Sequence, residues 1–231
     1  MIYKNWKPIY YEILKDFNFN RLEDEKTAEL LNKLLDDKQL ISKDEIKNFI
    51  ENNEVIVFGA GPSLENMIIK HKNKIKKCVK IASDGTTTAL LKYRIIPDII
   101  VTDFDGLIKD QIYASKKGSI IILHAHGDNY DNIKKYISNF EKNIIGTTQS
   151  NPAPYKNLKN YGGFTDGDRA IFLADHFNAK KITLIGFEFN GEIGEYSFPK
   201  NKDKNKKLKK LYWCKKLIEM LNSNKNKICV L

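Results

Sequence analysis

The chain has 231 residues, of which 42% are hydrophobic and 29% charged, which is enough apolar material for a core and excludes a disordered chain. No stretch reaches the roughly 18 to 20 apolar residues of a membrane helix, and the first residues lack the apolar core of a signal peptide. Three dispersed cysteines exclude a disulfide framework. We therefore expect a cytoplasmic protein without a membrane partner. The net charge of +10 rests on lysine, because only Arg21, Arg94 and Arg169 are arginines, and this disfavours a nucleic-acid partner.

The first 50 residues predict helices and no strand. Apolar residues recur at helical spacing over Trp6–Phe17 and again over Leu22–Leu35. Ser42 followed by Glu45 predicts a capping box that opens a third short helix. We therefore expect an N-terminal helical segment over residues 1–52, which either packs on the rest of the chain or forms a dimer contact.

From residue 53 to residue 190, short β-branched runs alternate with helical stretches. The expected strands are Val55–Phe58, Val79–Ala82, Ile99–Val101, Ile120–Leu123, Ile144–Gly146 and Ile182–Ile185. The expected helices are Ser63–Lys72, Thr86–Tyr93, Lys109–Lys116, Tyr130–Phe140 and Asp166–Phe177, with a loop near Thr147–Gly163. Most of the strands are apolar throughout, as in strands covered on both faces. The pattern predicts an α/β catalytic domain over 53–190 with a mostly parallel sheet and helices on both faces.

Residues 191–231 predict a lysine-rich loop, a C-terminal helix and a short strand. The segment Lys200–Lys210 has seven lysines and one aspartate, so it has little to bury, and we expect a mobile loop. Such a loop would either attract a polyphosphate or serve only solubility. The helix is expected over Leu208–Leu221 and the strand over Ile228–Leu231.

Polar, small or acidic residues follow five of the expected strands in succession. Ligands of open α/β sheets bind beyond the carboxyl ends of the strands, so these residues are candidates for a binding site. They are Gly59, Gly61, Ser63, Asp84, Gly85, Thr86, Asp103, Asp105, His124, His126, Asp128, Asn129 and Gln149. The turn from Gly59 to Ser63 opens a helix, where backbone amides favour phosphate, or it is only a tight turn capped by Ser63.

Asp103 and Asp105 flank Phe104 at a strand end. Residues two apart in a strand point to the same side, so both carboxylates should face one place while Phe104 faces the core. Two like charges this close repel each other unless a cation lies between them, and carboxylate oxygens suit Mg²⁺. The alternative is a helix cap next to a solvated carboxylate.

Two further sets of polar residues extend this candidate site. Asp166 and Asp168, with Arg169 after them, open the last predicted helix of the domain, where they either complete a magnesium site or only cap the helix. His124 and His126 share a face, but no third zinc ligand follows at a fixed spacing, so we expect contact with phosphate or substrate.

Six ordered segments together resemble a known family, the archaeal 6-hydroxymethyl-7,8-dihydropterin pyrophosphokinases (MptE-like). They are Val57–Leu64, Ala82–Thr86, Pro97–Asp105, His124–Asn129, Gly162–Ala170 and Leu184–Glu188. The resemblance implies transfer of pyrophosphate from ATP to the hydroxymethyl group of the pterin, with AMP as by-product, in tetrahydromethanopterin biosynthesis. It also implies Mg²⁺ as cofactor, and ATP and a pterin alcohol as partners.

For this chemistry the resemblance makes Asp103, Asp105, Asp166 and Arg169 the catalytic candidates. The expected Mg²⁺ ligands are Asp103, Asp105, Asp166 and Asp168. Phe164, Gln149, Asn151 and Asn129 are expected near the pterin ring.

A more distant resemblance connects the chain to the catalytic domain of thiamin pyrophosphokinases. It rests on Ser83–Thr86, Pro97–Gly106 and Thr165–Asp166. The chain departs from that pattern because Thr102 and Gly106 replace a glycine and a serine around the acidic pair, and because the β-rich second domain has no counterpart. This disfavours thiamin as the substrate.

Two other functions compete with this interpretation. A metal-dependent nucleotide-sugar glycosyltransferase related to flagellin-modifying proteins could use the same Asp-x-Asp pair and would bind UDP- or CMP-sugars rather than ATP. A nucleic-acid binder would use the lysine run, but arginine and interleaved aromatic residues are scarce there.

Overall fold

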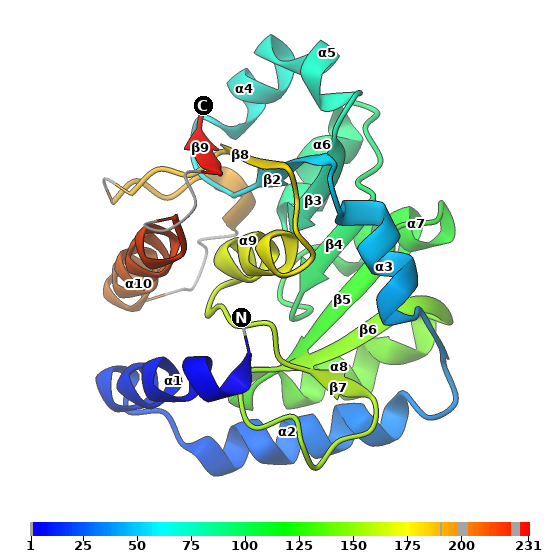
Figure 1. Cartoon of the computed structure of the whole chain (residues 1–231), viewed down its shortest axis with the longest axis vertical. Helices are drawn as coiled ribbons and strands as arrows, with labels where there is room; N and C mark the ends of the chain where they lie inside the picture. Colours follow the sequence, from blue (N-terminus) through cyan, green and yellow to red (C-terminus); the bar gives the residue numbers. More distant parts are fainter. Residues whose placement is uncertain (1, 190, 198–202, 223–226) are drawn as a thin grey trace.

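The computed structural model describes residues 2–189, 191–197, 203–222 and 227–231. Parallel strands form its central sheet, which confirms the predicted α/β class (Figure 1). Within the described residues the strand order is β1-β6-β5-β4-β3-β2-β8-β9, and β7 pairs with β6. The strands are β1 (Gln39–Leu40), β2 (Glu54–Phe58), β3 (Val79–Ser83), β4 (Ile99–Thr102), β5 (Ile120–Ala125), β6 (Lys142–Thr148), β7 (Leu158–Lys159), β8 (Lys181–Ile185) and β9 (Ile228–Val230).

Two of these strands differ from the expectations from sequence. The prediction of no strand in the first 50 residues is wrong, because β1 pairs with β6 through Gln39 opposite Lys142. The predicted loop after β6 contains β7, which pairs Leu158 with Gly146. Both strands have only two residues, so neither is long enough to show the period of two on which strand prediction depends.

Helices cover both faces of the sheet, as the apolar strands predict. One face carries α2 (Arg21–Leu34), α4 (Leu64–Lys70), α5 (Lys72–Ile75), α6 (Thr86–Lys92), α7 (Ile108–Lys116) and α8 (Tyr130–Tyr136), followed by η2 (Ile137–Asn139). The other face carries α3 (Lys43–Ile50), α9 (Asp166–His176) and α10 (Lys204–Asn222). Strand β2 shows the alternation, since Ile56 and Phe58 pack on the first face and Val55 and Val57 on the second.

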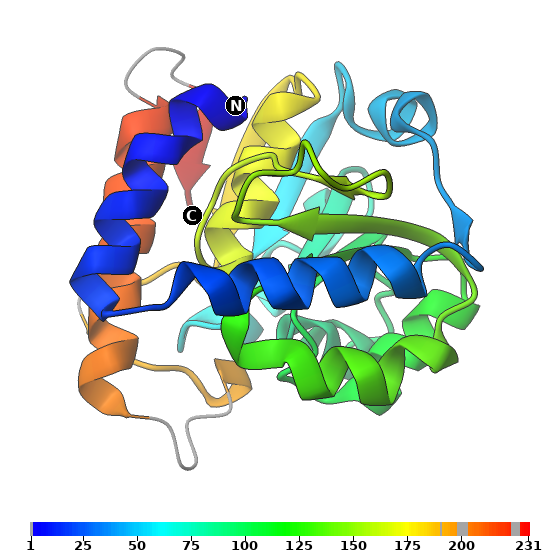
Figure 2. The ribbon, with the colours of Figure 1, turned by 90° about the horizontal axis from the view of Figure 1, so that it is seen from below.

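The N-terminal helices pack on their own sheet domain. Helix α1 (Tyr3–Phe17) buries Trp6 and Tyr10 in a cluster with Phe172 of α9 and Trp213 of α10. Figure 2 shows α1 running beside α10, and α2 beside α8. Helix α3 begins with the predicted capping box, in which Ser42 and Glu45 exchange hydrogen bonds of 2.8 and 3.1 Å.

The lysine run is helical where the structure describes it, so the prediction of a loop over Lys200–Lys210 is wrong for most of its length. Helix α10 begins at Lys204, four residues before the expected start, and residues 200–202 lie outside the described part of the chain. Lysine is a good helix former, and two ammonium groups of the run lie over aromatic rings, Lys206 Nζ over Phe19 and Lys209 Nζ over Phe17.

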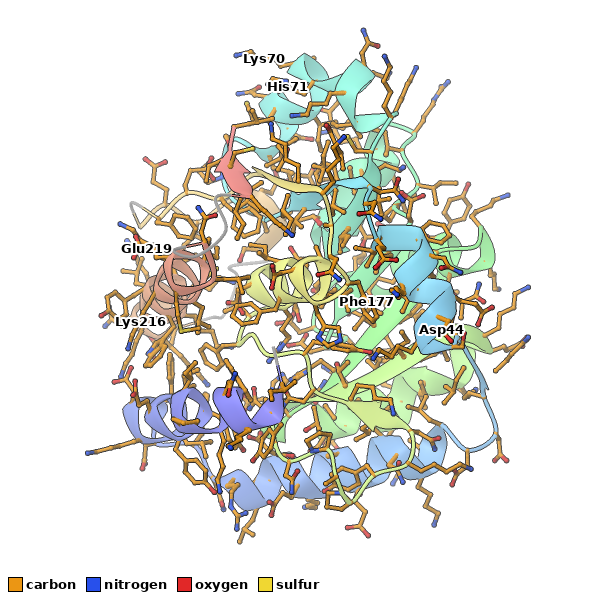
Figure 3. All side chains as sticks on the ribbon, in the orientation of Figure 1. Asp44, Lys70, His71, Phe177, Lys216 and Glu219 are labelled. Carbon is orange, nitrogen blue, oxygen red and sulfur yellow. The ribbon has the colours of Figure 1, made fainter. Side chains whose placement is uncertain are left out.

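Other features of the fold agree with the composition. The three cysteines are free thiols. Among the helices that the structure describes, none has both the length and the apolar character needed to cross a bilayer. His71, which the sequence analysis left out of the site, lies beside α4 at the end of the molecule away from α2 (Figure 3).

Candidate active site

A cavity of about 290 Å³ opens at the carboxyl ends of the strands. The cavity is lined by the segments that follow β2, β3, β4, β5, β6 and β8. Helices contribute as well: the start of α9, part of α2 with residues 18–20 before it, and the first half of α10. Twelve of the residues predicted from sequence line it: Gly59, Gly61, Asp84, Gly85, Asp103, Asp105, His126, Asp128, Gln149, Phe164, Asp166 and Arg169. The cavity therefore lies at the strand ends, where the sequence predicted a binding site.

Three aspartates from different elements converge inside this cavity. Asp84 follows β3, Asp103 follows β4, and Asp166 is the first residue of α9. Each offers one carboxylate oxygen, and the three oxygens lie within 4.8 Å of one another. A group of hard oxygen donors at this spacing fits a divalent cation such as Mg²⁺. We refer to Asp84, Asp103 and Asp166 as the acidic cluster.

Neighbouring side chains hold Asp84 in the cluster. Its Oδ1 accepts hydrogen bonds from Thr102 Oγ1 at 2.7 Å and from Gln111 Nε2 at 2.6 Å. Its backbone has a φ of 37°, which is unusual for a residue other than glycine and indicates a position fixed by its surroundings. Thr102, which replaces a glycine of the thiamin pyrophosphokinase pattern, is therefore one of the two anchors of Asp84.

Burial raises the pKa of Asp84 well above the ordinary carboxyl value, and the negative charges of Asp105 and Asp103 raise it further. Burial also raises the pKa of Asp166, with Asp103 as the next cause. The fold thus holds these carboxyl groups close together at a cost that a bound cation would relieve.

A turn, not a strand, brings Asp103 and Asp105 to the cavity. Strand β4 ends at Thr102, and Phe104 has a left-handed φ of 65°. The Phe104 ring stacks on Phe140 with the centroids 4.9 Å apart, which confirms that it faces the core. The turn gives the two carboxylates different surroundings, because Asp103 is buried and Asp105 is exposed.

His126 bonds directly to the acidic cluster. Its Nδ1 accepts a hydrogen bond from the backbone N–H of Asp128 at 3.2 Å, so in the neutral ring the proton is on Nε2. Nε2 lies 3.0 Å from Asp103 Oδ2 and donates to it. Burial alone would raise the pKa of Asp103, but the hydrogen bond from His126 and the charges of His126, Arg169 and Lys210 outweigh it and lower that pKa below its ordinary value.

Arg169 connects the cluster to the next strand end. One of its terminal nitrogens donates to Asp166 Oδ1 at 3.1 Å and the other to Gln149 Oε1 at 3.2 Å. The guanidinium has five N–H groups, so donors remain beyond these two bonds. Arg169 is buried at the cavity wall, where its positive charge lies next to the carboxylates.

The N-terminal helices complete this network through Asp24, a residue that the sequence analysis did not select. Its Oδ2 accepts from Tyr10 Oη at 2.6 Å and from Gln149 Nε2 at 2.8 Å, and its Oδ1 accepts from the Gly127 N–H at 2.7 Å. Asp24 thereby orients the Gln149 amide so that its oxygen meets Arg169. One signal was present in the sequence, because Asp24 shares the apolar stripe of α2 at helical spacing with Ala28 and Leu31.

The structure does not bring Asp168 into the acidic cluster. Its carboxylate accepts hydrogen bonds from the backbone N–H groups of Phe164 and Thr165 and, at 2.8 Å, from the Thr165 hydroxyl. These contacts form the capping box of α9, which was the alternative interpretation.

Asn129 and His124 lie behind the cavity wall. The Asn129 amide donates to the backbone oxygens of Asp103 at 2.9 Å and His124 at 2.7 Å, so it ties the ends of β4 and β5 together. His124 is buried, with Nδ1 3.0 Å from the Thr147 hydroxyl. Burial, followed by the charge of Arg169, lowers its pKa, so the ring is neutral.

Thr86 and Ser63 are also absent from the cavity lining. The Thr86 hydroxyl donates to the backbone oxygen of Phe58 at 3.3 Å. Ser63 precedes α4 without a side-chain cap bond. Gly61 does line the cavity, but the space around it is taken by the chain after β8, since a Cβ atom there would lie 2.7 Å from the Gly186 oxygen.

Comparisons with known proteins agree on one protein family. A family model described as "6-hydroxymethylpterin diphosphokinase MptE-like" matches residues 26–193. The 6-hydroxymethyl-7,8-dihydropterin pyrophosphokinase of Pyrococcus furiosus is 42% identical over 229 residues, which cover 97% of this chain and 96% of the relative. The proteins of the same name from Methanocaldococcus jannaschii and Methanothermobacter thermautotrophicus are 42% identical over 234 residues and 40% identical over 225 residues, with 94% and 95% of this chain and 95% and 94% of the relatives covered.

A solved structure gives a weaker match. The Maf glycosyltransferase from Magnetospirillum magneticum is 16% identical, with a TM-score of 0.49, and the match covers 72% of this chain and 27% of that one. A likeness at this level carries no argument about activity.

Proposed function

Because the chain belongs to the 6-hydroxymethylpterin diphosphokinase MptE-like family, we propose that it is a 6-hydroxymethyl-7,8-dihydropterin pyrophosphokinase that uses ATP as the donor. In this reaction the hydroxymethyl oxygen attacks the β-phosphorus of ATP, the bond from that phosphorus to the α-phosphate oxygen breaks, and AMP leaves. The observation that carries the proposal is the acidic cluster, which lies beside Arg169 in a cavity of about 290 Å³. Phosphoryl transfer depends mainly on positioning and charge neutralisation, and this cavity supplies groups for both.

We assign Asp84, Asp103 and Asp166 as the residues that would hold Mg²⁺. The donor set fits the ion, because the buried Asp84 and Asp103 and the half-buried Asp166 meet with oxygens only, and Asp84 and Asp166 have raised pKa values. The ion would neutralise phosphate charge in the transition state. The protein's own contribution is to fix the carboxylates through Thr102, Gln111 and His126 and to place the Arg169 guanidinium next to them, where it stabilises negative charge.

This assignment predicts that Mg²⁺ raises the melting temperature of the ligand-free protein more at about pH 8 than at about pH 5. Asp84 and Asp166 have folded-state pKa values above the unfolded ones. The metal-free folded state therefore binds more protons than the unfolded state, and it loses stability as the pH rises through the raised pKa values. Mg²⁺ stabilises the ionised carboxylates, so the increase in melting temperature that it causes becomes larger over the same pH range. Differential scanning fluorimetry with and without Mg²⁺ at matched ionic strength measures it, and equal shifts at both pH values would contradict the assignment.

The first turns of α10 supply positive charge to the cavity through Lys207 and Lys210. Replacing both with Gln, which keeps helix propensity, should raise the KM for ATP roughly 5- to 10-fold at low salt, because two partly exposed charges that attract the polyphosphate are lost. The effect should shrink at high salt, where screening already weakens the attraction. The matched control replaces Lys204 and Lys215, which lie on the same helix but are exposed and outside the cavity lining. An equal KM increase in the control would show that the effect is not local.

The experiment that tests the function incubates the purified protein with ATP, Mg²⁺ and 6-hydroxymethyl-7,8-dihydropterin. Separation of the nucleotides and ³¹P NMR of the pterin product should give AMP and a pterin diphosphate in equal amounts, with no reaction in excess EDTA. ADP with a pterin monophosphate would contradict pyrophosphoryl transfer. UDP- and CMP-sugars in place of ATP test the glycosyltransferase alternative, and we expect neither to be consumed.

A further inference from the structure

Glu188 lies in the cavity lining but has no role in the network described above. It is the third residue after β8, and its neighbours in the chain are Phe187 and Phe189, whose ring centroids are 6.3 Å apart. The carboxylate is half-buried, and its Oε2 is buried without a hydrogen-bond donor among the described residues. An unpaired acceptor of this kind costs free energy unless a ligand supplies the donor.

The turn after β2 leaves room for the Glu188 side chain. A Cβ atom at Gly61 would overlap Oε2 of Glu188, so glycine at position 61 leaves the room that the carboxylate occupies. The two residues are 127 positions apart and approach each other because β2 and β8 are neighbours. Other carboxylates of the cavity lining have partners, since Asp24 accepts three hydrogen bonds and Asp128 pairs with Lys206 at 3.4 Å.

The chemistry of a carboxylate selects between the two substrates. A carboxylate offers acceptors only, so it binds an edge with two adjacent donors and repels phosphate. The pyrimidinone edge of a pterin presents a ring N–H beside an exocyclic amino group, which are two adjacent donors. The Watson–Crick edge of adenine presents a donor beside an acceptor, which leaves one carboxylate oxygen facing a lone pair.

The strand order indicates how a pterin would be oriented in the cavity. Strand β2 lies between β3, which Asp84 follows, and β8, which Glu188 follows. Neighbouring strands are about 4.8 Å apart, so the two strand ends are separated by roughly 10 Å. A two-ring heterocycle with its hydroxymethyl arm spans about this separation, so a pterin whose pyrimidinone edge meets Glu188 would direct its hydroxyl group towards the acidic cluster.

We propose that Glu188 recognises the pterin by accepting hydrogen bonds from the ring N–H and the exocyclic amino group of its pyrimidinone edge, which makes it the residue that determines the acceptor substrate. The inference rests on the proposed function, because that function supplies the pterin. The flanking rings of Phe187 and Phe189 offer apolar surface to a planar ligand at the same wall.

The first test compares the wild-type protein and the Glu188→Gln variant, which has the same shape but presents a donor in place of one acceptor. We expect the KM for the pterin to rise about 10- to 100-fold, as for the loss of a hydrogen bond to a charged group, and the KM for ATP to stay unchanged. Glu195→Gln is the matched control, since Glu195 is exposed and outside the cavity lining. An unchanged pterin KM, or an equal increase in both KM values, would overturn the proposal.

The second test exchanges the partner group on the substrate. The analogue with a 2-oxo group in place of the 2-amino group presents an acceptor to Glu188, so the wild-type protein should prefer the natural pterin. In Glu188→Gln this preference should fall at least about 10-fold, because the new amide donor suits the 2-oxo group. A general packing role would leave the preference unchanged and so overturn the proposal. If the wild-type protein does not react with the pterin at all, the proposed function fails instead, which keeps the two failures distinct.

Discussion

Asp103→Asn should lower kcat about 1,000-fold, which corresponds to about 4 kcal/mol of transition-state stabilisation. Asparagine keeps an oxygen that can accept the hydrogen bond from His126, but it removes the charge that is central to the acidic cluster. The loss expected when such a cation site fails is several kcal/mol. The measurement is steady-state kinetics at saturating Mg²⁺ and both substrates, with thermal unfolding to confirm that the variant is folded.

Asp44→Asn is a suitable control for this variant. Asp44 is an exposed aspartate near the start of α3, labelled in Figure 3, and it is not among the residues that line the cavity. It should retain wild-type activity. Asp105→Asn should lose less activity than Asp103→Asn, because Asp105 is exposed at the cavity wall. Near-normal turnover by Asp103→Asn would refute the assigned cation site.

Gly106→Ala should lower kcat by about 100-fold or more, although it adds only one methyl group and removes no polar group. The new Cβ atom would overlap Oδ2 of Asp84. The carboxylate has little freedom to move, because its other oxygen is held by Thr102 and Gln111. Asp84 would then leave the position in which its oxygen meets those of Asp103 and Asp166.

Thr102→Val is a second test of whether the position of Asp84 matters for activity. It removes the hydrogen bond to Asp84 without adding bulk, so its loss of activity should be smaller than that of Gly106→Ala. Both variants should keep a cooperative thermal transition. If Gly106→Ala bound Mg²⁺ and turned over like the wild type, the position of Asp84 would not matter for the reaction.

Sequence reasoning found most of the sheet and the part of the cavity formed by the strand ends for a specific physical reason. Buried parallel strands are continuous apolar runs, and such runs are visible without any knowledge of contacts. Each run ends where polar residues begin, and the parallel arrangement brings those ends to one edge. Asp84, Asp103 and Asp166 are distant in the chain, but all three were therefore among the selected residues, and their carboxylates lie together in the structure.

The same reasoning misjudged the local geometry wherever tertiary contacts decided it. Strand alternation predicted that Asp103 and Asp105 face one place, and both line the cavity. A turn with the left-handed backbone of Phe104, not a strand, puts them there, and it leaves one carboxylate buried and the other exposed. Asp168 was expected as a metal ligand, but the nearby N–H groups of its own helix cap take its oxygens. Local hydrogen bonds compete with a distant site, and the motif alone does not show which prevails.

The contributions from the two ends of the chain were invisible for a different reason. Asp24 reaches Gln149 across 125 positions, and Glu188 reaches Gly61 across 127, so no spacing in the sequence relates them. The lysines of α10 were recognised as a charge run, but the expected helix began only at Leu208, because the rings of Phe17 and Phe19 next to Lys209 and Lys206 cannot be inferred from the sequence.

The packing of α1 against α9 and α10 has a consequence for synthesis on the ribosome. Helix α1 emerges before most of the sheet and α10 after it, yet Trp6 and Trp213 belong to one buried cluster. Until α10 has emerged, the apolar face of α1 remains partly uncovered, and the wall of the cavity that carries Lys207 and Lys210 does not exist. A chain trimmed to the matched span, 26–193, would lack α1, α10 and Asp24 altogether. The nascent protein can therefore form most of its sheet early, but its cavity is complete only when α10 has packed against α1.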